Sequence, residues 1–262
     1  DIIKLLTKTD GQGNISQGAI ALGAFNNIKN AKELLALLIL QSGNPIVARS
    51  AGDPVVTLKD SFGFNKQPAG EAIGFFLNFT NPANTLYSWN SSESEARDTF
   101  LRGKLALYLG FGSEVERLTA QNPQLNFNLA LPPQRELGGR ELTLGRFTFL
   151  TFPRGAKNPS TAYKVANLLA GPEFAKLIAG VAKLPPARND LLRPLPADSD
   201  QALLYQAAIV TRDWLDPAPD KTALIFRRMV EAISLGRIDS SRAIGDADAE
   251  LQALMPRNEN QN

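Results

Sequence analysis

The sequence has 262 residues, with 28 Lys and Arg against 26 Asp and Glu, a formal net charge of +2, and neither His nor Cys. Without these two residue types, Ser-His-Asp and Cys-His nucleophiles, His-ligated zinc and Cys-x-x-Cys redox sites lack their chemical parts. A net charge of +2 over this length gives no field that would hold a phosphate backbone. We therefore expect no catalytic residue of these classes, no metal site, no cofactor and no nucleic-acid partner.

The longest uninterrupted apolar run covers residues 34–40, which is far shorter than the roughly 20 residues of a membrane span. The chain begins with Asp1-Ile2-Ile3, without an initiator Met, a basic n-region or a signal-type hydrophobic stretch. We expect a chain that was trimmed or that is a fragment of something longer, with no membrane span of its own.

The first hundred residues alternate between turn signals and helical patterns. Two apolar patches flank residues 10–14, Asp-Gly-Gln-Gly-Asn, which predict a hairpin turn. A helix is expected over 31–40, ended by the Gly and Pro that follow, and another from about residue 69. A third helical pattern runs from about residue 92 to Gly103.

From residue 105 the apolar period changes from helical to alternating, which predicts strands over 105–109, 125–131 and 146–152. The leucine side of 125–131 is expected to be buried in the centre of a sheet. Asn158-Pro159 and Gly171-Pro172 each open a helix, and three more helical stretches follow after Pro194-Leu195-Pro196. These elements predict an α/β fold with more helix than strand.

Residues 105–114 read as a strand, a tight turn and a helix start. A dinucleotide fingerprint is rejected because its third glycine position holds Val115. Ser113 and Glu116 instead fit a capping box, and the backbone N–H groups of the turn would point beyond the carboxyl end of the strand, where open α/β sheets bind ligands. The alternative is a plain capped helix.

Acidic side chains cluster in three places along the sequence, and a hydrolase with two carboxylates needs such pairs. Spacing alone does not place any pair across a cleft, and solvated helix faces are the competing interpretation. The sets are Glu93/Glu95, Asp213/Asp216/Asp220 and Asp246/Asp248/Glu250.

Both tryptophans lie in polar loops, Trp89 in Tyr-Ser-Trp-Asn and Trp214 in Arg-Asp-Trp-Leu-Asp-Pro. Aromatic faces beside Asn, Asp and Arg suit sugars, which stack their C–H face on the ring while their hydroxyls need donors and acceptors. Alternatively, each Trp pins its loop to the core.

Several segments, in this order along nearly the whole chain, resemble those of one protein family. Residues 98–106, Asp-Thr-Phe-Leu-Arg-Gly-Lys-Leu-Ala, resemble the "AF..GK.AM" stretch of extracellular solute-binding protein family 1, the maltose-binding-protein-like receptors of ABC importers. The other similar segments are 21–43, 125–134 with its Leu-Pro-Pro turn, 156–188, and 214–237.

This resemblance implies a two-lobed, hinge-closing α/β protein of the type II periplasmic-binding-protein class. Because the family is usually much longer, the chain resembles its carboxyl-terminal portion. Residues 1–145 and 198–262 would form the second lobe, and 146–197 would be a partial return into the first lobe. Residues 146–197 would then present an apolar face with little to cover it, or would recruit a partner chain.

The resemblance also implies a ligand cleft lined near Glu33, Phe111, Ser113 and Trp214, with Trp89 as a further candidate. Two Trp positions of the family are not Trp here: Ser113 is nearest to the one in the strand-end turn, and Ala223 to the one in the later helix. Trp214 would take over stacking from the preceding loop.

The function expected from the resemblance is non-enzymatic capture of a carbohydrate, typically an oligosaccharide, for delivery to the membrane subunits of an ABC importer. The protein would be extracytoplasmic, in the periplasm or as a cell-surface lipoprotein, with its signal or anchor upstream. The alternatives are another solute on the same fold, such as a polyamine or peptide, and a carboxylate-dependent carbohydrate hydrolase.

Overall fold

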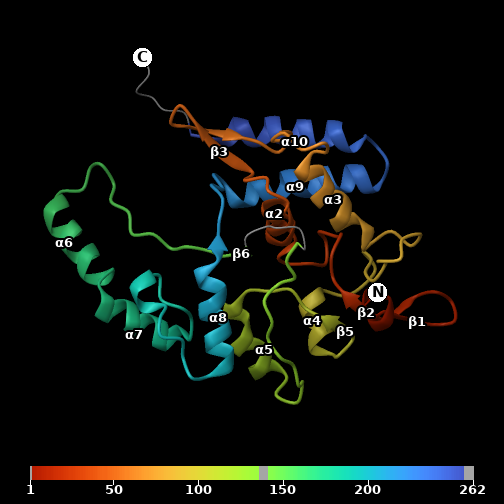
Figure 1. Ribbon diagram of the computed structural model, residues 1–262, viewed down its shortest axis with the longest axis horizontal. Coiled ribbons are helices and arrows are strands. Elements are labelled where there is room, and N and C mark those ends of the chain that lie inside the picture. Colours follow the sequence, from red (N-terminus) through yellow and green to blue (C-terminus); the bar gives the residue numbers. More distant parts are fainter. Residues whose placement is uncertain (1, 136–140, 257–262) are drawn as a thin grey trace. The chain divides into compact units, whose positions relative to one another are not determined.

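The computed structural model describes residues 2–135 and 141–256, which fall into two units (Figure 1). As far as it is described, unit 1 contains Asp1–Gly110, Gln134–Arg140 and Trp214–Asn262, and unit 2 contains Phe111–Pro133 and Glu141–Asp213.

The units have different bounds from the lobes expected from the sequence. The expected first-lobe segment, 146–197, lies wholly in unit 2, but unit 2 also contains 111–133 and 198–213, which were expected in the second lobe. The assignment of segments to lobes stays a prediction.

Unit 1 opens with helix α1 (Ile2–Leu6) and a three-stranded sheet in the order β1–β2–β5. β1 (Lys8–Thr9) and β2 (Ile15–Ile20) are antiparallel, as the predicted hairpin requires. The Asp10 carboxylate closes their turn, accepting 2.9 Å hydrogen bonds from the backbone N–H groups of Gln12 and Asn14.

The third strand, β5 (Leu105–Leu107), pairs in parallel with β2 in the register Gly18↔Leu105 and Ile20↔Leu107. The connection between these parallel strands contains three helices, the arrangement expected of an α/β fold. They are α2 (Ala31–Gln41), α3 (Pro68–Asn78) and α4 (Ala96–Leu101), with the hairpin β3 (Val47–Ser50) and β4 (Asp53–Val56) after α2.

The core of unit 1 lies where α2 and α3 meet α9 (Pro219–Ser234) and α10 (Ser240–Leu254), the two blue helices that run side by side in Figure 1. The apolar stripe predicted on α9 is buried through Phe226, Met229 and Val230. Gly23 is needed where α3 passes, because its φ is +88° and an added Cβ would lie 2.8 Å from the Phe76 carbonyl oxygen.

Unit 2 is made of short elements, mostly helices. They are the 3-10 turn η1 (Gly112–Glu114), α5 (Val115–Gln121), β6 (Thr143–Leu144), α6 (Pro159–Leu169), α7 (Pro172–Ala182), the 3-10 turn η2 (Asn189–Leu191), α8 (Ser199–Ile209) and β7 (Thr211–Arg212). β6 and β7 pair in parallel, and α6 begins at Pro159 and α7 at Pro172, as predicted.

The predictions of strands over 125–131 and 146–152 are wrong. Neither segment forms a β-strand. Leu125, Phe127 and Leu129 are only half-buried, and the residues between them are exposed. The alternation of apolar residues therefore comes from an extended segment of which only one side is partly buried. Pro123, Pro132 and Pro133 bracket it and have no N–H to donate to a strand ladder.

Within residues 2–135 and 141–256, no single helix has the length and apolar composition to cross a membrane. α6 and α7 meet that test only when taken together, and they are bent by 57°.

Candidate functional site

A nearly buried ion pair joins the start of α2 to the loop that precedes α9 in unit 1. The Lys32 ammonium lies 2.6 Å from an Asp216 carboxylate oxygen, and the two side chains are only 12% and 15% exposed. The other oxygen of Asp216 accepts a 2.8 Å hydrogen bond from the Thr222 hydroxyl, on the first turns of α9. The Asp216 end of the pair is therefore held by a second contact.

Glu33 extends this pair, because one of its carboxylate oxygens lies 3.8 Å from the Lys32 ammonium and its side chain is 16% exposed. One cation thus lies between two carboxylates at the start of a helix. We call Lys32, Glu33 and Asp216 the Lys32 cluster.

Trp214 lies two residues before Asp216, in the loop that precedes α9, and offers an aromatic surface there. Its ring stacks on that of Phe226, with centroids 5.9 Å apart and planes 15° from parallel, and Phe226 is fully buried in α9. Trp214 itself is only half-buried. A stacked ring on a core residue is a fixed platform with part of its surface still accessible, which is what sugar stacking requires.

The structure places Trp89 in the core, which corrects its prediction as a ligand contact. Its side chain is fully buried, and its indole N–H donates a 3.0 Å hydrogen bond to the Asn27 side-chain oxygen. The Asn27 amide in turn donates to the carbonyls of Asn90 and Glu93. Trp89 and Asn27 together hold the loop before α4, in agreement with the alternative interpretation given for this Trp.

Phe111 and Ser113 belong to unit 2, where they form the turn before α5. The Arg146 guanidinium lies over the Phe111 ring, 4.3 Å from its centroid, and the Phe111 N–H donates to the Glu114 carboxylate at 3.0 Å. The predicted capping box of Ser113 and Glu116 is wrong. Glu114 caps this turn because its side chain reaches back to the residue before η1, while Glu116 pairs with Lys183 and Ser113 is exposed.

The predicted site residues are therefore distributed unevenly. Glu33 and Trp214 both lie in unit 1, where the Lys32–Asp216 ion pair joins the start of α2 to the loop that contains Trp214. Phe111 and Ser113 lie in unit 2, and Trp89 lies in the core. Sequence reasoning missed Lys32 as the central cation. Its partner is 184 residues away, so no local pattern signals the pair.

Each of the acidic sets that suggested a hydrolase has at least one member with a structural partner. The Glu95 side chain caps α4 by accepting a hydrogen bond from the Arg97 N–H. Asp248 is almost fully buried and forms an ion pair with the Lys59 ammonium at 3.1 Å. Glu250 pairs with Arg228, and Asp216 with Lys32. Among the described residues, no group of three or more acidic side chains is placed to hold a metal ion.

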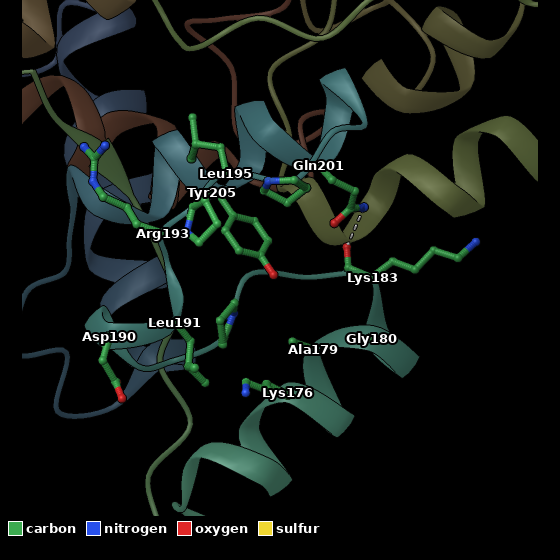
Figure 2. A pocket seen from close by; sticks show the side chains of 13 residues that line it. Lys176, Ala179, Gly180, Lys183, Asp190, Leu191, Arg193, Leu195, Gln201 and Tyr205 are labelled. Atoms are coloured by element: carbon green, nitrogen blue, oxygen red, sulfur yellow. Dashed lines mark hydrogen bonds between the residues drawn. The ribbon is translucent and has the colours of Figure 1, made fainter.

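Unit 2 also contains a pocket of about 820 Å³ between α7, the loop after it and α8 (Figure 2). Leu191, Tyr205 and several prolines line it, and the Gln201 amide donates a 3.1 Å hydrogen bond to the Lys183 carbonyl at its edge. Two charged groups that line this pocket have partners. A hydrogen bond to Glu116 raises the pKa of Lys183, and hydrogen bonds donated by Arg188 lower the pKa of Asp190.

No family model and no curated protein sequence matches this chain. Solved structures do match it. A cyclo/maltodextrin-binding protein complexed with maltotetraose matches with a TM-score of 0.69 and 12% sequence identity. The match covers 96% of this chain and 62% of that protein. The chain has the type II periplasmic-binding-protein fold.

Two further solved structures of binding proteins also match this chain. The maltose/maltodextrin-binding domain of Bdellovibrio bacteriovorus, bound to maltotriose, has a TM-score of 0.62 and 13% identity over 96% of this chain. An ABC transporter solute-binding protein of Thermotoga lettingae, bound with alpha-D-tagatose, has a TM-score of 0.60 and 14% identity over 94%. The chain spans between 61% and 64% of the length of these three proteins.

Proposed function

We propose that this chain is part of an extracytoplasmic carbohydrate-binding protein that captures a sugar and delivers it to an ABC importer. The observation that carries the proposal is the fold, because the matched structures contain maltotetraose, maltotriose or tagatose. The loop before α9 supports it, because this loop contains both the fixed Trp214 ring and Asp216, which pairs with Lys32.

Unit 1 supplies the ligand surface in this proposal, and Trp214 is its main contact. A sugar ring would stack on the exposed part of the indole while its hydroxyls bond to Glu33 and Lys32. A polyamine, the alternative ligand, would compete with the Lys32 ammonium for the same two carboxylates.

Binding by the 262-residue chain alone is expected to be weak. A small ligand gains most of its affinity when a site buries the greater part of its surface. One aromatic platform and a few solvated hydrogen bonds give a Kd of about a millimolar or weaker. Submicromolar binding would show that the site is already complete.

Isothermal titration calorimetry with maltotriose, maltotetraose and tagatose tests the proposal. Trp214→Ala is expected to abolish the weak binding, whereas Tyr163→Ala removes an exposed aromatic ring of unit 2 and leaves binding unchanged. Equal loss in both variants, or no binding of any sugar at tens of millimolar, would contradict the proposal.

The proposal includes binding without turnover. Incubation of the pure chain with a panel of glycosides is expected to release no product. Hydrolysis that Glu33→Gln or Asp216→Asn abolishes would favour the carboxylate-dependent hydrolase instead.

A further inference from the structure

The pocket of Figure 2 lies wholly within unit 2, whereas Trp214 and the Lys32 cluster belong to unit 1. Its volume of about 820 Å³ falls within the roughly 300 to 1,000 Å³ of small-molecule sites. Three segments build it, namely the second half of α7, the loop that follows, and the first half of α8. The pocket therefore has the size of a ligand site that the sugar-binding proposal does not use.

Hydrogen bonds at two places hold the walls of the pocket together. The Arg188 guanidinium donates to the Ala170 carbonyl at the end of α6 and, in a bidentate contact, to the Asp190 carboxylate. The Gln201 amide donates to the Lys183 carbonyl and joins α8 to the end of α7. The frame of the pocket is thus formed before a ligand enters, which lowers the entropic cost of binding.

Most of the wall surface is apolar and conformationally restricted. Proline fixes its own φ, and Pro186 is buried while Pro196 is half-buried. Leu191 and Ala179 add aliphatic surface, and the Tyr205 hydroxyl stands in the middle of the lining side chains in the close-up (Figure 2). An apolar hollow with few polar groups directed into it is the usual form of a small-ligand site.

Cations outnumber carboxylates in the lining of the pocket. The cations are Lys176, Lys183 and Arg193. The one lining carboxylate, that of Asp190, is already paired with Arg188, and the hydrogen bonds from this guanidinium lower the pKa of Asp190. Lys183 is likewise paired, with Glu116 of α5. The paired Asp190 does not offset the other two cations.

The two remaining cations have weak partners or none. Lys176 pairs with Glu173 at 3.8 Å, and the two side chains are 59% and 90% exposed, so this ion pair contributes little. Within residues 2–135 and 141–256, the Arg193 guanidinium and the Tyr205 hydroxyl form no hydrogen bond or ion pair. A hydroxyl donor and a surplus of positive charge are therefore available to a ligand.

We propose that the pocket between α7 and α8 binds a small organic anion with an apolar ring, an aromatic carboxylate. Its ring would lie against the proline and leucine side chains. Its carboxylate would accept a hydrogen bond from the Tyr205 hydroxyl and pair with the Lys176 ammonium. Such charge-assisted hydrogen bonds are roughly twice as strong as neutral ones. The proposed site does not depend on sugar binding by unit 1.

Fluorine NMR with para-fluorobenzoate tests this proposal. Broadening of the fluorine line is titrated against the 262-residue chain, and para-fluorobenzyl alcohol is the neutral probe with the same ring. Because the carboxylate supplies the charge-assisted contacts, para-fluorobenzoate should bind about tenfold more tightly than the alcohol. Equal affinities for the two probes, or no broadening of the para-fluorobenzoate line at millimolar concentrations, would overturn the proposal.

A pair of glycine substitutions shows whether the probe occupies this pocket. Gly180 lies on the wall that α7 contributes, and Gly245 lies in α10 of unit 1. An added Cβ meets no atom within 4 Å at either position, and Leu is the better helix former, so both variants should fold. Gly180→Leu should abolish the broadening, and Gly245→Leu should leave it unchanged. Broadening that survives Gly180→Leu would mean adsorption to other apolar side chains and would contradict the proposal.

Two conservative variants test the contacts of the carboxylate. Tyr205→Phe removes only the hydroxyl, and Lys176→Gln removes only the positive charge. Each should weaken para-fluorobenzoate binding about five- to tenfold, because each removes one charge-assisted contact. Tyr163→Phe and Lys164→Gln are the matched controls on α6, outside the pocket lining, and should leave the affinity unchanged. Affinity unchanged in Tyr205→Phe and Lys176→Gln, or lowered equally in the controls, would overturn the proposal.

Discussion

Apolar side chains are distributed differently in the two units, although both units are rich in helix. Nearly all of the buried hydrophobic residues among those described lie in unit 1, and unit 2 contributes only Leu118, Ala179 and Leu192. Unit 1 closes its helices α2, α3, α9 and α10 around one core. Unit 2 instead exposes the residues that its helices should bury.

Helices α9 and α7 illustrate this difference in burial between the two units. Both begin with Pro in the first turn and both have an apolar stripe. The stripe of α9 is buried because α2, α3 and α10 surround it, whereas the stripe of α7 includes Leu177, Ile178 and Val181, all more than half exposed. An amphipathic pattern predicts the helix and the face that needs a partner, but not whether that partner is present.

The largest effect is expected at Trp89, in the core of unit 1. Trp89→Ala should lower the free energy of unfolding by about 3–5 kcal/mol, because it empties a fully buried site and removes the donor to Asn27. Denaturant unfolding followed by circular dichroism measures this loss. Trp89→Phe is the milder control and should lose less. A loss below about 1 kcal/mol for the Ala variant would mean that unit 1 does not depend on this core.

The Lys32–Asp216 ion pair should give the next largest effect. Asp216→Ala removes the nearest carboxylate from a nearly buried ammonium and leaves it only the weaker contacts to Glu33 and the Pro219 carbonyl, so it should cost about 2–4 kcal/mol of unfolding free energy. The exposed pair of Arg227 and Glu231 on α9 serves as the control, and Glu231→Ala should cost about 0.5 kcal/mol or less. Similar losses in both variants would show that the Lys32 cluster is not a fixed structural unit.

Much of the helical part of this fold could be predicted from sequence, because helix signals are local. Pro159 and Pro172 mark two helix starts, and the spacing of Phe226, Met229 and Val230 marks the buried face of α9. The strand predictions over 125–131 and 146–152 were wrong. A β-strand also needs a neighbouring strand to pair with, and an alternating apolar pattern does not show whether one is present.

The candidate site could be predicted only in part for the same reason. Glu33 and Trp214 were both identified, but nothing local connects them, and the ion pair of Lys32 and Asp216 that does so spans most of the chain. Trp89 has a polar sequence context similar to that of Trp214 and lies fully buried. Its indole N–H donates to Asn27, which is 62 positions away in the sequence, so the local polar context did not reveal this partner.

A paired substitution at two leucines tests the difference between the units directly. Leu37→Ala, in the buried face of α2, should cost about 2–5 kcal/mol, whereas Leu177→Ala on α7 should change the free energy of unfolding by less than about 0.5 kcal/mol. Both are Leu residues in 11-residue helices, so helix propensity changes equally. A large cost at Leu177 in the 262-residue chain would mean that α7 is covered in solution, for example by a second copy.

The smallest effects are expected at two exposed carboxylates, one in each unit, which report local order. The side chain of Asn14 lowers the pKa of Asp10 through a hydrogen bond in the turn of unit 1, and the Arg188 guanidinium lowers the pKa of Asp190 in unit 2. The Arg188 contact is bidentate, with both distances 3.0 Å. Asn14→Ala and Arg188→Gln should each raise the pKa of the facing carboxyl toward its ordinary value, as measured by NMR titration of the side-chain carboxyl carbons.

The sign of the linked stability effect follows from these directions. A carboxyl whose pKa is lower in the folded chain stabilises it above the ordinary pKa, and this contribution is lost as the pH falls through the folded value. Both aspartates should therefore favour the folded state at neutral pH and lose that effect in acid. If Asp10 titrates at a lowered pKa while Asp190 titrates at its ordinary value, the loop after α7 is not ordered in the isolated chain. Unit 2 would then lack local order as well as a buried apolar face.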